Sequence, residues 1–192
     1  PSPSNVRELR ASLEMNRWND SAISVREVAV AELSSKRELF VPSSAALSSL
    51  DYVYAGAGCS AQSCTSVKIQ TETLDTLVAA WLAGVDATQG IQHPNRQPNS
   101  PEWQTGGIDL VIVNTMGSEW RALNGSSDLL RRRVVRIWAI MIYAHIDDQG
   151  LTGAKREELI VHLLLQTGGY HVTVDSTYVE QSMDRFIIAR LQ

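Results

Sequence analysis

The sequence predicts a mainly α-helical fold, with a four-helix-bundle-like core and a few short strands. Three observations support this prediction. Apolar residues recur at helical spacing in several segments, glycines and prolines separate those segments, and only short stretches alternate as strands do. Hydrophobic residues make up 44% of the 192 residues, which is enough for a single domain with a sizeable core.

Periodicity and capping residues place the elements in order. Helices are predicted at 6–15, 21–38, 71–84, 127–146 and 152–166, with an additional C-terminal helix at 176–191. Short strands are predicted at 66–70, 108–113 and 170–174, and the segment 45–54 fits either a helix or a strand. The single domain 1–192 then has a flexible tail at 1–5, a long loop at 89–107 and a C-terminal extension at 176–192.

Charge and cysteine content limit the classes of function. The formal net charge is −4, so binding of a polyanion must depend on a local basic patch. Cys59 and Cys64 form either a local disulfide or two free thiols, and no further cysteine or adjacent histidine completes a zinc site. The longest apolar run, 137–144, is too short to cross a bilayer, so we expect no membrane partner.

Four arginines form the most informative cluster: Arg131, Arg132, Arg133 and Arg136. On the predicted helix 127–146, the last three share one face and repel one another. Guanidinium groups suit phosphate oxygens and carboxylates, so an external anion would relieve that repulsion. The alternative is a solvated face that is paired with Asp128 or Glu119.

Evidence for catalysis is weaker. His145 precedes Asp147 and Asp148, but a metal needs three or four converging ligands, so neither a metal site nor a cofactor is predicted. The sequence contains no nucleophile elbow and no phosphate-binding glycine loop. Trp103 and Trp120 flank loops and are candidates for a subunit interface, with burial in the core as the alternative.

Four segments, in order, resemble coat proteins of rod-shaped helical plant viruses of the tobamovirus type. They are Trp18-Asn19-Asp20, the segment 73–86 (TLDTLVAAWLAGVD), Ser127-Asp128-Leu129-Leu130-Arg131-Arg132-Arg133, and Thr167-Gly168-Gly169-Tyr170. The resemblance implies a four-helix bundle that stacks helically around RNA, with Arg132 and Arg133 on phosphates. The chain departs from the family in a longer stretch 74–170 and in its C-terminal segment.

The sequence therefore predicts a non-enzymatic viral coat protein. It would self-assemble as a homo-oligomer, package single-stranded RNA through Arg131, Arg132, Arg133 and Arg136, and be found in virions and in the host cytoplasm. No small-molecule substrate is expected. The first alternative is a cellular helical interaction module with an arginine face for an acidic partner. The second is a small hydrolase-type enzyme that uses His145 or Asp147.

Overall fold

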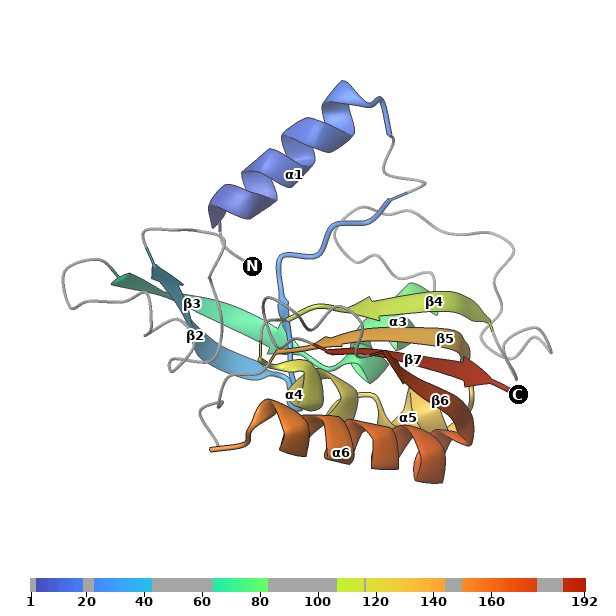
Figure 1. Ribbon diagram of the computed structural model, residues 1–192. Coiled ribbons are helices and arrows are strands. Elements are labelled where there is room, and N and C mark those ends of the chain that lie inside the picture. The colour runs from blue at the N-terminus through green and yellow to red at the C-terminus, as the bar shows by residue number, and fades with distance from the viewer. Residues whose placement is uncertain are drawn as a thin grey trace.

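The computed structural model contains both sheets and helices, so the predicted mainly α, four-helix-bundle-like core was wrong. Figure 1 shows a mixed α/β architecture with two separate β-sheets. The structure describes residues 3–18, 23–42, 64–82, 107–115, 117–143, 150–175 and 185–192.

Helices and strands are interspersed along the described chain. The elements are α1 (Pro3–Met15), β1 (Ala29–Val30), β2 (Ser35–Pro42), β3 (Cys64–Glu72), α3 (Leu74–Leu82), β4 (Ile108–Val113), α4 (Glu119–Asn124), α5 (Ser127–Arg131), β5 (Val135–Ile142), α6 (Gly153–Leu163), the π-helical turn η3 (Leu164–Gly168), β6 (Tyr170–Asp175) and β7 (Arg185–Leu191).

Six local predictions agree with the structure. The helices at 6–15, 71–84 and 152–166 correspond to α1, α3 and α6 with η3, and the strands at 66–70, 108–113 and 170–174 lie in β3, β4 and β6. The side chain of Thr152 accepts a hydrogen bond from the Lys155 amide at 3.2 Å, which caps α6. The segment 45–54 lies outside the described residues.

Three predicted helices were wrong, and each contains a strand instead. The described part of 21–38 holds β1 and the start of β2, the helix at 127–146 ends at Arg131 before β5, and the described part of 176–191 is β7. In 127–146, Leu130, Val134, Ile137 and Met141 also fit a helical stripe. However, β-branched residues fill β5, and they favour a pleated sheet.

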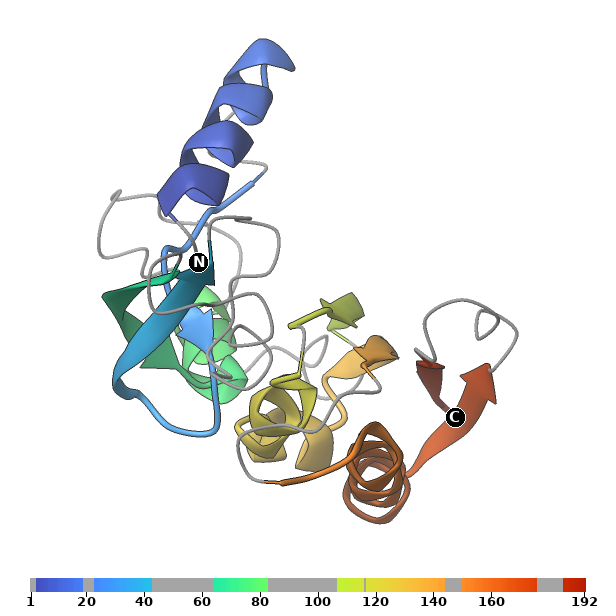
Figure 2. The ribbon, with the colours of Figure 1, turned by 60° about the vertical axis from the view of Figure 1, so that its left-hand side comes forward.

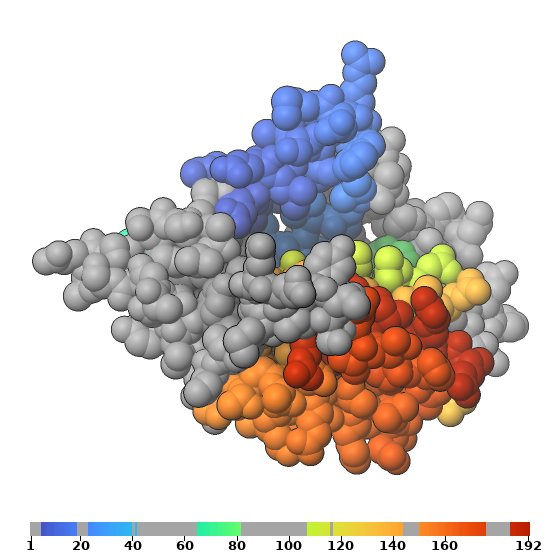
Figure 3. All heavy atoms as spheres, viewed as in Figure 1, coloured from blue at the N-terminus to red at the C-terminus, as the bar shows by residue number. Residues whose placement is uncertain are grey.

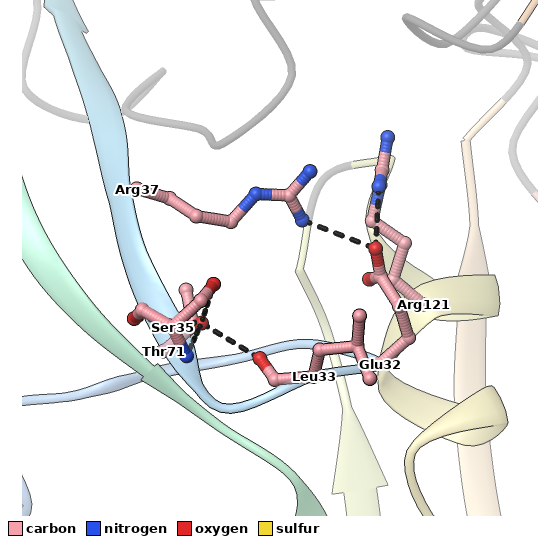
Figure 4. Close-up of polar contacts among 6 residues, drawn as sticks. All are labelled: Glu32, Leu33, Ser35, Arg37, Thr71 and Arg121. Carbon is pink, nitrogen blue, oxygen red and sulfur yellow. Dashed lines mark hydrogen bonds and ion pairs between the residues drawn. The ribbon is translucent and has the colours of Figure 1, made fainter.

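The three-stranded sheet has the order β1-β3-β2, with β2 antiparallel and β1 parallel to β3. The buried hydroxyl of Thr71 on β3 donates to the carbonyls of Leu33 at 2.8 Å and Ser35 at 3.0 Å (Figure 4). This hydroxyl therefore holds the turn between β1 and β2 against the central strand.

Glu32, in that same turn, joins the three-stranded sheet to α4. Its Oε1 accepts hydrogen bonds from Arg121 at 2.9 Å and Arg37 at 3.2 Å (Figure 4). Burial acts to raise the pKa of Glu32, but a backbone hydrogen bond and the two arginine charges outweigh it and lower that pKa. Glu32 is therefore a charged structural link between the two halves of the fold.

The four-stranded sheet has the order β4-β5-β7-β6. β4 and β5 are parallel, and β7 runs antiparallel to both of its neighbours, β5 and β6. Figure 1 shows α4, α5 and α6 together on one face of this sheet. Trp138, Ile140 and Ile187 point into the core between sheet and helices, where each large side chain contributes roughly 1.5–3 kcal/mol.

A fully buried ion pair connects α4 to α6. Arg156 Nε lies 3.8 Å from Glu119 Oε2, and both side chains are 0% exposed. Arg156 also donates to the carbonyls of Leu151 at 2.8 Å and Tyr143 at 2.5 Å. Burial raises the pKa of Glu119, partly opposed by hydrogen bonds and by the Arg156 charge. The pair fixes the helical layer under the sheet.

Helix α1 stands apart from both sheets. Figures 2 and 3 show it projecting from the rest of the chain. Leu9 and Met15 are exposed, and Arg10 forms an ion pair with Glu27 at 2.6 Å. The core therefore belongs to the four-stranded sheet and its helices, not to α1.

Candidate anion-binding cleft

The four arginines of the cluster do not share a helix face. Arg131 is the last residue of α5, Arg132 and Arg133 form the following turn, and Arg136 lies on β5. The predicted single helical face was wrong because the chain turns immediately after Arg131. The start of α5 is fixed by Asp75, whose carboxylate accepts hydrogen bonds from the amides of Asp128 and Leu129, both at 2.9 Å.

The turn after α5 is a Schellman motif. The amide of Arg133 donates to Leu130 O at 3.1 Å, and that of Val134 donates to Leu129 O at 3.2 Å. Arg133 occupies the left-handed position with φ 54°, where glycine is usual. An arginine there costs about 1–2 kcal/mol relative to a right-handed conformation, and burial of Val134 and Leu129 in the core offsets it.

The side chain of Arg133 lies against a pair of glycines after η3. A Cβ added to Gly169, which has φ 63°, would lie 2.8 Å from Arg133 Nη2. A Cβ on Gly168 would lie 2.3 Å from the ring of Tyr170, whose hydroxyl donates to Val135 O at 2.7 Å. The two glycines therefore provide the space that the guanidinium and the aromatic ring occupy.

A cleft of about 890 Å³ opens beside this turn. We name it the arginine cleft, and its lining residues are Asp109, Arg133, Arg136, Ile137, Arg190, Leu191 and Gln192. Its three arginines come from the turn after α5, from β5 and from β7. The antiparallel pairing of β5 with β7 places Arg190 opposite Ile137, next to Arg136 along β5. Residues far apart in sequence thus meet at one site.

The charges in the cleft are only partly compensated. Asp109 Oδ1 accepts a hydrogen bond from Arg136 Nη1 at 3.1 Å, and both side chains are largely exposed. Arg131 is paired with Asp128 at 2.6 Å. Within the described residues, Arg133 and Arg190 form no ion pair. Among the described lining residues, three guanidinium groups against one side-chain carboxylate give a net positive side-chain charge.

Tyr170 is the first residue of β6, pairs with Leu191 of the cleft lining, and has a buried side chain beside Gly168. Burial raises the pKa of its phenol, and the nearby charge of Arg133 acts in the opposite direction. The opposing effect of Arg133 is the electrostatic signature of a guanidinium held near the phenol.

Two of the three arginines that line the cleft were predicted from the sequence, and the third was not. Arg133 and Arg136 were predicted and line the cleft, whereas Arg131 and Arg132 do not line it. Arg190 and Asp109 were missed. Both lie on strands, and only the register with β5 brings them to Arg136.

The remaining predicted positions lie away from the cleft. His145, Asp147 and Trp103 are outside the described residues, and Trp120 on α4 is half-buried and packs against the core. The part of the chain that the structure describes contains no group of three side chains suited to a metal ion. In the same part, no helix is long and apolar enough to cross a membrane.

The arginine cleft has the chemistry of an anion site. Guanidinium groups bind oxyanions through paired N–H donors, and the cleft lining supplies three of them from separate segments. The described residues that line the cleft include no buried nucleophile and no acid–base pair. Comparison of the chain with models of protein families, with curated proteins and with solved structures found no match.

Proposed function

We propose that this protein binds a phosphate-bearing polyanion in the arginine cleft, with single-stranded RNA as the expected form of that ligand. The role is stoichiometric binding without turnover. The observation that supports the proposal is the convergence of Arg133, Arg136 and Arg190, two of which form no ion pair with any described carboxylate. Packaging in a helical particle was inferred from a bundle architecture that the described chain lacks, so the proposal is limited to binding.

Phosphate fits the cleft better than a single carboxylate does. A phosphate group offers several oxygens to guanidinium donors that approach from different segments, whereas a carboxylate presents one edge. The chain as a whole is acidic, so attraction must arise locally and fall as salt rises. Ile137 and Leu191 add an apolar side to the cleft, and they read no base sequence.

The test is fluorescence anisotropy with a labelled oligouridylate. The double variant Arg133→Ala/Arg190→Ala should weaken binding by about ten-fold or more, because hydrogen bonds to charged groups are worth about 1.5–3 kcal/mol each. The matched control is Arg7→Ala/Arg17→Ala, which removes the same charge from α1 and the turn that follows it.

Equal weakening by both double variants would show general charge attraction and would overturn the cleft as the site. Polyglutamate provides the comparison with an acidic protein partner. If polyglutamate binds more tightly than the oligouridylate at equal salt, the ligand is an acidic protein and the phosphate proposal is wrong.

A further inference from the structure

Among the described residues that line the cleft, Asp109 is the one with a side-chain carboxylate, and an anion site would bind better without it. Its position follows from the fold. The parallel register pairs Ile108 with Val135 and Leu110 with Ile137, so Asp109 and Arg136 are neighbours across β4 and β5. β4 is the edge strand of the four-stranded sheet, which leaves this pair at the open side of the cleft.

We propose that Asp109 is an internal competitor for Arg136: it occupies this guanidinium until a ligand phosphate displaces it. The inference rests on the proposed function of the cleft. It assigns to Asp109 a role in setting how strongly charged a ligand must be in order to bind.

The contacts of the pair suit displacement. A single hydrogen bond of 3.1 Å joins Asp109 to Arg136, and the two side chains are 87% and 64% exposed. Exposed ion pairs of this kind stabilise a fold very little, so breaking one costs little. The Asp109 carboxylate makes no other ion pair within the described residues, and it can swing away while β4 stays paired.

The other arginines of the cleft lack such a competitor. Arg133 and Arg190 form no ion pair with described carboxylates, so they offer their donors directly. A ligand that reaches only Arg136 exchanges one anion for another and gains nothing. A ligand that also reaches Arg133 or Arg190 gains new charge-assisted hydrogen bonds. Asp109 therefore favours ligands with several closely spaced negative charges over single carboxylates.

Replacement of Asp109 tests the inference with the same labelled oligouridylate. Asp109→Asn keeps the size of the side chain and removes its charge, and it should tighten binding by about two- to five-fold, which corresponds to the loss of one exposed ion pair. Glu158→Gln is the control, because it removes an equal charge from the exposed Lys155–Glu158 pair on α6, outside the cleft lining. That control should leave affinity within about two-fold.

A double-mutant cycle separates competition from general repulsion. In an Arg136→Gln background, Asp109→Asn should change affinity by less than about two-fold, because the guanidinium for which Asp109 competes is gone. An equal gain in both backgrounds would mean that Asp109 acts only through long-range repulsion, and this would overturn the inference. Weaker binding by Asp109→Asn would also overturn it, since Asp109 would then contact the ligand.

The two proposals fail in different ways. If the unaltered protein binds the oligouridylate and Asp109→Asn binds equally well, the cleft functions and only the competitor role is wrong. If neither protein binds, the proposed function itself is wrong. Circular dichroism of each variant establishes that the fold is intact before affinities are compared.

Discussion

Helices α1 and α5 end in the same backbone motif, each with an arginine in the left-handed conformation. Arg17 has φ 55° and Arg133 has φ 54°. At the end of α1, the amides of Arg17 and Trp18 donate to the carbonyls of Glu14 and Leu13, both at 3.0 Å. The turn after α5 has the same two hydrogen bonds, so the two helix ends match in geometry and in residue type.

Their surroundings differ. Trp18, which follows Arg17, is 58% exposed, whereas Val134, which follows Arg133, is 1% exposed and part of the core. Arg133 packs against Gly169 and lines the cleft, while Arg17 lies on the exposed end of α1. A left-handed arginine therefore does not identify a site by itself. What distinguishes α5 is a buried turn that directs the strained residue toward two other arginines.

The largest expected difference between the two helix ends is in how much each turn contributes to the free energy of unfolding. Leu129→Ala should lower the free energy of unfolding by about 2–4 kcal/mol, because it leaves a cavity in the core. Leu13→Ala, at the equivalent position of the half-exposed α1 turn, should cost less than about 1 kcal/mol. Urea denaturation measures both, and equal losses would contradict the view that only the α5 turn is built into the core.

A second pair of variants tests how Arg133 is held in place. Gly169→Ala and Gly150→Ala both place a side chain at positive φ, at a cost of about 1 kcal/mol each. Only at Gly169 does the new Cβ also meet a guanidinium, because nothing lies within 4 Å of the Gly150 position. Gly169→Ala should therefore weaken oligouridylate binding by about three-fold or more. Gly150→Ala should leave that binding unchanged, and equal affinities would show that Gly169 does not position Arg133.

The strain itself can be removed at both helix ends. Arg17→Gly and Arg133→Gly should each raise the free energy of unfolding by about 1 kcal/mol, because glycine adopts positive φ without steric cost. Thermal and urea unfolding check this gain. Only Arg133→Gly should also weaken oligouridylate binding, by about ten-fold. If Arg17→Gly weakens binding as much, then α1 is part of the binding surface and the contrast between the two ends fails.

The smallest effect concerns Tyr170. Of the two helix ends, only the turn after α5 has this tyrosine beside it. Because the pKa of this phenol is raised in the folded protein, the unfolded chain loses the phenol proton at a lower pH than the folded chain does. The stability that Tyr170 contributes is therefore present below the ordinary tyrosine range and declines as pH rises through its folded pKa. Arg133→Ala should move the tyrosinate absorbance titration to higher pH, since a charge that lowers this pKa is lost. Arg17→Ala should leave it in place, and Tyr170→Phe identifies the transition.

Where a local sequence pattern fits only one kind of secondary structure, that pattern was sufficient to predict the element. The alternation in 66–70 and the aliphatic run 108–113 predicted strands, and the segment 152–166 was predicted as a helix, each of which is the correct element. The segment after Arg131 carries two patterns at once, since its apolar residues fit a helical stripe and its β-branched residues fit a buried strand. Pairing with β4 and β7 decides between them, and this is a long-range interaction that no local window contains.

The same limit applies to the site. Clustered arginines identified the basic character of the region from residue type alone. The composition of the cleft could not be predicted, because Asp109 and Arg190 reach Arg136 only through strand register. The role of Gly169 was also hidden, since a glycine after a helix looks like an ordinary stop signal until Arg133 is seen against it.

The position of β7 between β5 and β6 has a consequence for how the chain matures. In sequence order, β7 is the last strand of the four-stranded sheet, yet it is an interior strand and carries Arg190. The cleft is therefore completed only after the rest of the sheet has been synthesised and β7 has inserted between its neighbours. Ligand binding therefore requires the fully folded sheet. A bound ligand stabilises that folded sheet as a whole by mass action.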